Sequence, residues 1–276
     1  MLGNGGNQFQ WWFSKNTAPS TTPGVSVVPG SGSKGSYIEL ASAAELTQDC
    51  YGIMLWVHAG NTSATIRDLL IDIGTDPGGG SSYSQVHGIS DIYAPQSSNA
   101  VFGGRWFWFP FFIKAGVSVG VRGKANNTST FRIKAWFFGQ PSRPDMIRAA
   151  QYAETIGVSG NGGTPFTCGN SGAEGSWTSI GTTTRSLWWW QLAFGNNVGT
   201  TTAQMYYADL AYGDGSTFHI IIENMPMFNP STSEYAGNPL WPFCYCEVPA
   251  GATLYVRGSA SGTAETTEAV AVGLGG

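Results

Sequence analysis

The sequence predicts an all-β protein with two tandem antiparallel β-sandwich domains, jelly-roll-like, that follow an extended N-terminal arm. Three observations support this prediction. Apolar and polar residues alternate as in strands, turn signals recur about every ten residues, and a set of short motifs occurs twice in the same order. We expect the arm to span 1–34, the first domain 35–140, a linker 141–171 and the second domain 172–276.

The segment 1–34 is rich in Pro, Gly, Ser and Thr and has no helical period. Trp11, Trp12 and Phe13 lie within it. Exposed aromatic side chains are a liability unless they are covered. We therefore expect this trio to dock on the chain's own domain or on a neighbouring subunit.

Four motifs of the first domain return in the second with only short insertions. The pairs are GSYIEL and GSWTSI, YGIMLWVHAG and SLWWWQLAFG, LIDIGTD and YADLAYGD, and FPFFIKAGVSVGVRG and WPFCYCEVPAGATLYVRG, beginning at residues 35 and 175, 51 and 186, 70 and 207, and 109 and 241. In the last pair, the spacing from Gly116 to Arg122 equals the spacing from Gly251 to Arg257. We interpret this as tandem duplication of a unit of about 100 residues, a common domain size.

Within each copy the pattern has the period of a strand. Val117, Val119 and Val121 alternate with polar or small residues, so the apolar side chains share one face and Arg122 lies on the other. The second copy repeats the pattern around Arg257. The two helical candidates are short. They are Pro144 to Ala153 and Ser42 to Asp49, where Ser42 and Glu45 have the spacing of a capping box.

An aromatic block begins at Trp106, and its counterpart follows residue 240. We expect such aromatic residues to pack between sheets, where they bury large areas. Consecutive strand residues face opposite sides, however, so part of each block must be covered by the other domain, the arm or another subunit. The candidate interface residues are Trp11, Trp12, Phe13, Trp106, Trp108, Trp188, Trp189 and Trp190. Sugar stacking on exposed tryptophans remains the alternative use.

The carboxylates that occur in both copies are the strongest candidates for catalysis or metal binding. Asp72 and Asp76 recur as Asp209 and Asp214, and they could bind calcium, form a glycosidase-like pair or stabilise turns. Turn formation is the favoured interpretation, because aspartate is common in turns. His58, His87 and His219 have no metal-ligand spacing, and no nucleophile elbow or phosphate-binding loop occurs in a suitable context. We predict no catalytic residue, cofactor or metal.

Composition restricts the partners. Only 11% of the residues are charged and the formal net charge is -4, so a nucleic-acid partner is not expected. No apolar run approaches the ~20 residues that span a bilayer, and no secretory signal is recognised. We expect no membrane partner and synthesis in the cytoplasm. Four cysteines are present, and the favoured interpretation is buried free thiols: Cys50, Cys168, Cys244 and Cys246.

The repeated pattern of an aspartate motif, an aromatic-Pro and a Val-Arg-Gly strand resembles structural proteins of tailed bacteriophages. It is carried by 72–76 and 109–123, and again by 209–214 and 241–258. This resemblance implies a non-enzymatic virion component that is assembled in the host cytoplasm, such as a head decoration or tail accessory. Its partners would be major capsid or tail proteins. Closed homo-oligomers are common, and a trimer would present six similar domains.

Three functional hypotheses follow. The preferred one is a capsid decoration or cement protein on the outer shell. The second is a tail or fibre component that binds a host-surface glycan through exposed tryptophans. The third is a glycan hydrolase that uses Asp72 and Asp209, and it is the least favoured.

Overall fold

The structure is a computed structural model that describes residues 11–13, 24–58, 68–95, 104–139, 149–196, 202–229 and 244–276. Within these ranges all regular elements are strands, so the all-β prediction is confirmed. No helix among the described residues has the length and apolar character to span a membrane. The strands form four sheets, which we number 1 to 4.

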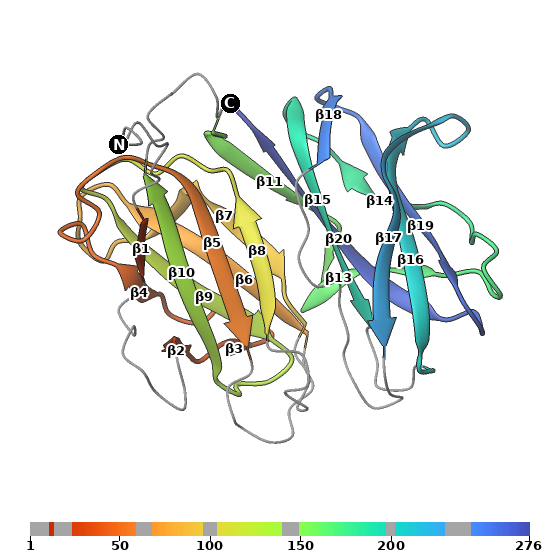
Figure 1. The fold of residues 1–276 in the computed structure, drawn as a ribbon, viewed down its shortest axis with the longest axis horizontal. Helices are drawn as coiled ribbons and strands as arrows, with labels where there is room; N and C mark the ends of the chain where they lie inside the picture. The colour runs from red at the N-terminus through yellow and green to blue at the C-terminus, as the bar shows by residue number, and fades with distance from the viewer. Residues whose placement is uncertain are drawn as a thin grey trace, which may run out of the picture.

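Two sheets belong to the first half of the chain (Figure 1). Sheet 1 has the order β1–β10–β5–β8, with β2 also paired to β10: β1 (Trp11–Phe13), β10 (Phe131–Gly139), β5 (Cys50–His58), β8 (Arg105–Phe109) and β2 (Val25–Val27). Sheet 2 has the order β3–β9–β6–β7, with β4 also paired to β9: β3 (Gly30–Ser31), β9 (Ser118–Ala125), β6 (Leu69–Asp76), β7 (Ser84–Tyr93) and β4 (Ile38–Ala41).

The second half supplies the other two sheets. Sheet 3 has the order β12–β13–β20–β15–β18, with β11 also on β20: β12 (Val158–Ser159), β13 (Gly162–Thr167), β20 (Thr266–Gly275), β15 (Leu187–Asn196), β18 (Cys244–Val248) and β11 (Tyr152–Ile156). Sheet 4 has the order β14–β19–β16–β17: β14 (Thr178–Thr182), β19 (Thr253–Ala260), β16 (Gln204–Gly213) and β17 (Phe218–Asn229).

The two halves use matching strands in the same order. The run β10–β5–β8 of sheet 1 corresponds to β20–β15–β18 of sheet 3, and β4–β9–β6–β7 corresponds to β14–β19–β16–β17. A tandem duplication would produce this correspondence, and the division into two tandem domains, with its boundaries, stays a prediction. The expected arm contributes β1, β2 and β3, and the expected linker contributes β11, β12 and β13.

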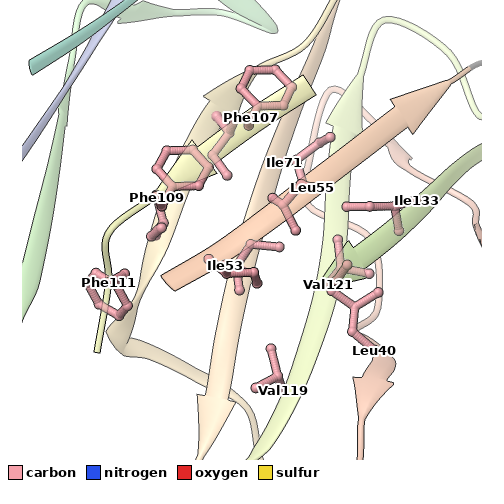
Figure 2. Close-up of a cluster of buried hydrophobic side chains, with 14 of the residues drawn as sticks. Leu40, Ile53, Leu55, Ile71, Phe107, Phe109, Phe111, Val119, Val121 and Ile133 are labelled. Atoms are coloured by element: carbon pink, nitrogen blue, oxygen red, sulfur yellow. The ribbon is translucent and has the colours of Figure 1, made fainter. Parts of the chain in front are cut away.

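Alternating strands enclose the core between sheets 1 and 2. Along β10, Phe131, Ile133, Ala135 and Phe137 are buried, while the residues between them are half-buried. Figure 2 shows aliphatic and phenylalanine side chains from both sheets converging in this core. A separate cluster lies between sheets 3 and 4 and includes Trp190. Burial of apolar side chains on one strand face is the main stabilising term for such sandwiches.

The halves meet at a seam, which we define as the contact of sheet 3 with sheet 2 and the core of the first half. Leu70 and Tyr93 of sheet 2 pack with Ala193 and Val270 of sheet 3. Other side chains from the second half join the core of the first half: Ala153, Trp189, Val272 and Leu274. The Lys124 ammonium also donates to the Gly160 carbonyl oxygen at 2.5 Å, and the Thr155 hydroxyl donates to the Ser90 carbonyl oxygen.

Neither short helix that the sequence suggested is present where the structure describes it. Residues 43–45 form a turn, which ends before a helix can propagate, although the Ser42 amide and hydroxyl do bond to the Glu45 carboxylate at 2.7 and 2.8 Å. Of the range 144–153, residues 144–148 lie outside the described part. Tyr152 and Ala153 belong to β11, because pairing with β20 outweighs the helical signal.

Candidate binding surface

The outer face of sheet 1 carries a continuous group of aromatic side chains, which we call the tryptophan face. Strand alternation puts the core residues on one side and these residues on the other: Met54, Trp56 and His58 of β5, Trp106 and Trp108 of β8, and Arg132, Lys134, Trp136 and Phe138 of β10. Their registers place Trp56 between Lys134 and Trp106, and Met54 between Trp136 and Trp108. Cross-strand neighbours at this spacing contact one another directly.

Four rings form one continuous row across the face, with two stacked contacts and one tilted contact. The Trp56 ring lies 4.1 Å from His58 at an interplanar angle of 26°, and 6.0 Å from Trp106 at 31°. Trp106 in turn lies 5.4 Å from Trp136 at 29°. Trp56 and Trp106 therefore have aromatic neighbours on two sides. Trp106 is also 36% exposed, the largest exposure on this face among the large hydrophobic residues described.

A glycine makes room for the remaining ring pair. Trp108 meets Phe138 edge to face with centroids 4.8 Å apart. Both residues flank Gly52 of β5, where a Cβ atom would lie only 2.2 Å from Cη2 of Trp108. A side chain at this position would push the indole off the sheet. Gly52 thus keeps the tryptophan face flat at its β8 side.

Two cations lie at the other end of the face. Arg132 and Lys134 are half-buried next to His58 and Trp56, and one Arg132 nitrogen donates to the Gly24 carbonyl oxygen at 3.3 Å. The face is therefore apolar on β8 and positively charged on β10. This combination of aromatic area and arginine is typical of protein interfaces.

The predicted interface residues fall in three places. Trp106 and Trp108 lie on the tryptophan face, and Trp11, Trp12 and Phe13 form β1, which pairs with β10 of the same chain. The side chains of β1 lie outside the described part. Sequence reasoning missed Trp56, Trp136 and the two cations, although the alternation of YGIMLWVH and FRIKAWFF contains the signal.

The three consecutive tryptophans of β15 are divided between the two cores. Trp190 is fully buried in the second half, where its indole nitrogen donates to the Cys246 carbonyl oxygen at 3.0 Å. Trp189 faces the other way and packs against the core of the first half. Trp188 is half-buried. Another part of the same chain therefore covers the side of β15 that faces away from its own core.

Two of the repeated aspartates are held in ion pairs with arginines. Asp72 and Asp209 are buried, and each accepts a bond from an arginine Nε, Arg122 at 2.8 Å and Arg257 at 2.9 Å. The arginines lie over Tyr37 and Trp177, at 4.6 Å from each ring centroid. The same three-part unit is built twice, and it holds neighbouring strands together at a matched register.

The other two aspartates stabilise turns. Asp76 accepts the amides of Gly78 and Ser82 at 2.8 and 2.9 Å, and Asp214 accepts those of Ser216 and Thr217 at 2.9 and 2.8 Å. Backbone donors lower the pKa of both carboxyls, to about 2 for Asp214. The turn interpretation fits these contacts. Within the described ranges no group of three or more His, Cys, Asp or Glu residues could hold a metal ion.

A second polar cluster lies buried at the seam. The Tyr93 hydroxyl donates to the Glu268 carboxylate at 3.2 Å, and the Gly163 amide donates to the same oxygen at 3.0 Å. Asp68 lies beside them, 3.5 Å from the Tyr93 hydroxyl. Burial raises the pKa of Asp68 to about 6 and, with the neighbouring Asp68 charge, that of Glu268 to about 7. Burial thus makes the charged form of each carboxyl less favourable in the folded chain than in water.

Comparisons with known proteins do not assign a family. No family model matches the chain, and no curated protein matches it in sequence. Solved structures align along the chain at low similarity. PNGase F, a glycosylasparaginase from Flavobacterium meningosepticum, is 8% identical with a TM-score of 0.38 and 96% coverage of each chain.

Two further alignments are weaker. The tandem CBM22-1-CBM22-2 domains of Paenibacillus barcinonensis Xyn10C are 10% identical with a TM-score of 0.26, over 96% of this chain and 91% of that chain. Infectious bursal virus-derived T=1 particles give 10% identity and a TM-score of 0.27, over 97% of this chain and 70% of theirs. TM-scores at this level carry no functional argument, so the tailed-phage resemblance remains a hypothesis.

Proposed function

We propose that the chain is a non-enzymatic structural component of a bacteriophage particle, and that the tryptophan face is an assembly contact with another protein surface. The observation that carries this proposal is the row of rings from His58 to Trp136. Trp56 and Trp106 each have neighbouring rings on two sides, which leaves less of each ring face for stacking on a sugar. A flat array of partly covered rings fits a protein surface better than it fits a sugar, which needs an accessible ring face.

The charge distribution supports the same role. Arg132 and Lys134 border the aromatic area, and arginine and aromatic residues are the residue types that are enriched in protein interfaces. Hydrolysis of glycans by Asp72 and Asp209 finds no support in the geometry, because an arginine occupies one oxygen of each carboxylate. Among particle roles, the outer-shell decoration or cement protein remains the preferred form of the proposal.

The copy number of the chain in purified particles tests this proposal. Quantitative mass spectrometry would measure it relative to the major shell subunit. A number comparable to the shell subunit supports decoration or cementing, and a few copies per particle supports a tail or portal position. Absence from particles would overturn the virion role.

Glycan binding by a tail or fibre component is the second candidate. The exposure of Trp106 on a surface with three other tryptophans favours it. Tryptophan fluorescence would be titrated with host-surface glycans in the wild-type chain and in the Trp106→Ala variant. A saturable change that disappears in the variant would establish this second role, and no change at any glycan concentration would exclude it.

A further inference from the structure

The seam inside the chain shows how one half covers an open sheet face of the other. The outer face of sheet 3 is buried there: Ala193 and Val270 pack on Leu70 and Tyr93, and Val272 and Leu274 join the core of the first half. This face therefore has a partner within the chain.

The tryptophan face is the counterpart of that buried face. The motif alignment matches Met54 with Trp189, and each of these residues pairs across its sheet with an equivalent partner, Trp136 for Met54 and Leu274 for Trp189. The same face is thus covered in the second half and accessible in the first, where Trp106 is 36% exposed.

The covering surface also has a counterpart. Asp91 of β7 and Asn224 of β17 both have positive φ, 53° and 52°, and both donate their amide to the repeated aspartate, Asp72 or Asp209. This match relates Tyr93 to Pro226 and Ser90 to Glu223. The strand β17 of the second half is therefore the counterpart of β7, which contributes Tyr93 to the seam.

The outer side of β17 is apolar and accessible. Two of its large hydrophobic side chains are strongly exposed, Ile220 at 43% and Phe228 at 51%. Glu223 is exposed on the same strand. This surface, which we call the β17 side, carries a carboxylate where the tryptophan face carries Arg132 and Lys134.

The seam predicts which charges would meet. Ser90 accepts a hydrogen bond from Thr155, and Thr155 pairs with Val272. Val272 pairs with Gln191. The motif alignment matches Gln191 with Trp56, and Trp56 pairs with Lys134, so Lys134 is the counterpart of Val272. A contact that repeats the seam between two chains would therefore bring Glu223 close to Lys134.

We propose that the protein self-associates head to tail, with the β17 side of one copy covering the tryptophan face of the next copy. The contact repeats between chains the arrangement that the seam makes within one chain. Such a heterologous interface forms a ring if its rotation closes, and a filament if it does not. This inference rests on the proposed assembly function and names a second copy of the chain as the first partner.

Native mass spectrometry and light scattering of the full chain, from low to high concentration, would test the proposal. Trp106→Glu alters the tryptophan face and Phe228→Glu alters the β17 side. Both positions are exposed, so circular dichroism is expected to show unchanged folding. Wild type is expected to form oligomers, and each variant alone is expected to be monomeric.

Mixing the two variants gives the decisive result. Each variant keeps one intact surface, so an equimolar mixture is expected to form a one-to-one heterodimer and nothing larger. Loss of association by Trp106→Glu alone, with Phe228→Glu unaffected, would overturn the proposal in favour of a symmetric contact between two tryptophan faces. A heterodimer that does not form would also overturn it.

A charge exchange tests the predicted register. Lys134→Glu and Glu223→Lys are each expected to weaken self-association by about tenfold or more, because like charges then face one another. The chain that carries both changes restores opposite charges and is expected to recover most of the affinity. Lys114→Glu, an exposed reversal outside both surfaces, is the matched control. No recovery in the double variant would place Lys134 and Glu223 apart and reject the repeat of the seam.

The two proposals can fail separately. A wild-type chain that stays monomeric at every attainable concentration overturns the head-to-tail contact, while its copy number in particles still decides the virion role. An oligomeric chain that is absent from particles overturns the virion role alone. Saturable glycan binding by a monomer would assign the tryptophan face to sugars instead.

Discussion

The Trp106 ring stacks on the Trp136 ring across the outer face of sheet 1, with centroids 5.4 Å apart. The two residues come from strands that do not pair with each other, since β5 lies between β8 and β10. The indoles thus span a whole strand. This stack makes the face rigid before any partner arrives, which reduces the entropy lost on association.

Removal of Trp106 is expected to affect stability only slightly. An aromatic pair contributes about 1 kcal/mol beyond the area it buries, so Trp106→Ala should lower the free energy of unfolding by about 1–2 kcal/mol at this partly exposed site. Trp190→Ala is the matched contrast, because it empties a fully buried site and should cost about 3–5 kcal/mol. Urea unfolding under monomeric conditions measures both. Equal losses would show that the tryptophan face serves stability more than binding.

The duplicated aspartate–arginine unit predicts an asymmetry between the halves. In the first half Lys34 also contacts Asp72, at 2.6 Å, whereas Glu174 takes its place beside Arg257 in the second half. Arg257→Met leaves Asp209 without a cation among the described residues, and it should cost about 3–5 kcal/mol.

Arg122→Met is the matched variant for this comparison, and it should cost clearly less because Lys34 remains next to Asp72. Thermal and urea unfolding of the two variants measure the difference. A larger loss for Arg122→Met would contradict the role assigned to Lys34.

The buried carboxyls at the seam predict a pH dependence. Burial raises the pKa of Glu268 to about 7 and that of Asp68 to about 6, above their values in the unfolded chain. A raised pKa in the folded state means that stability is fully present at low pH and is lost as the pH rises through the folded pKa. Stability should therefore fall between about pH 4.5 and 7 from this source.

Two substitutions separate this effect from other titrations. Asp68→Asn with Glu268→Gln should flatten the stability profile between pH 5 and 7, as measured by urea unfolding at fixed pH values. The lowered pKa of Asp214 acts in the opposite direction, so Asp214→Asn should alter stability only above its folded pKa of about 2 and mostly at neutral pH. An unchanged slope of stability against pH in the variant that carries both Asp68→Asn and Glu268→Gln would rule out the seam carboxyls as the origin of the pH dependence.

The cysteines are expected to react in two classes. Burial raises the pKa of Cys50 to about 12 and of Cys168 to about 11, and both side chains are fully buried. Cys244 and Cys246 are half-buried free thiols on β18. A thiol reagent should label these two in the native chain, and all four after unfolding. Rapid labelling of Cys50 in the native chain would contradict its burial in the core of the first half.

Alternation and repetition predicted most of the fold. Val119 and Val121 are buried on β9 while Arg122 lies on the other face, as the period of two requires. The equivalent strand around Arg257 follows the same rule. Short-range pattern is sufficient for these two strands, because their alternating segments have one buried face.

The seam and the tryptophan face could not be predicted in the same way. The role of Trp189 depends on how the two halves pack, which is a property of tertiary structure and not of local periodicity. The Asp72–Arg122 pair joins residues that are 50 positions apart, and neither residue alone indicates a partner. The expectation at Ser42 was wrong for a related reason: its capping contact forms, but the segment is too short to continue as a helix.

The shared core at the seam constrains how the chain can fold. Tyr93 and Glu268 are in contact although they are 175 positions apart, and Val272 and Leu274 of β20 complete the core of the first half. During translation the first half therefore waits, incompletely covered, until β20 has been made. Closing so long a loop is slow. A first half that is expressed alone would leave Leu70, Tyr93 and part of its core uncovered, and it is expected to aggregate more readily than the full chain.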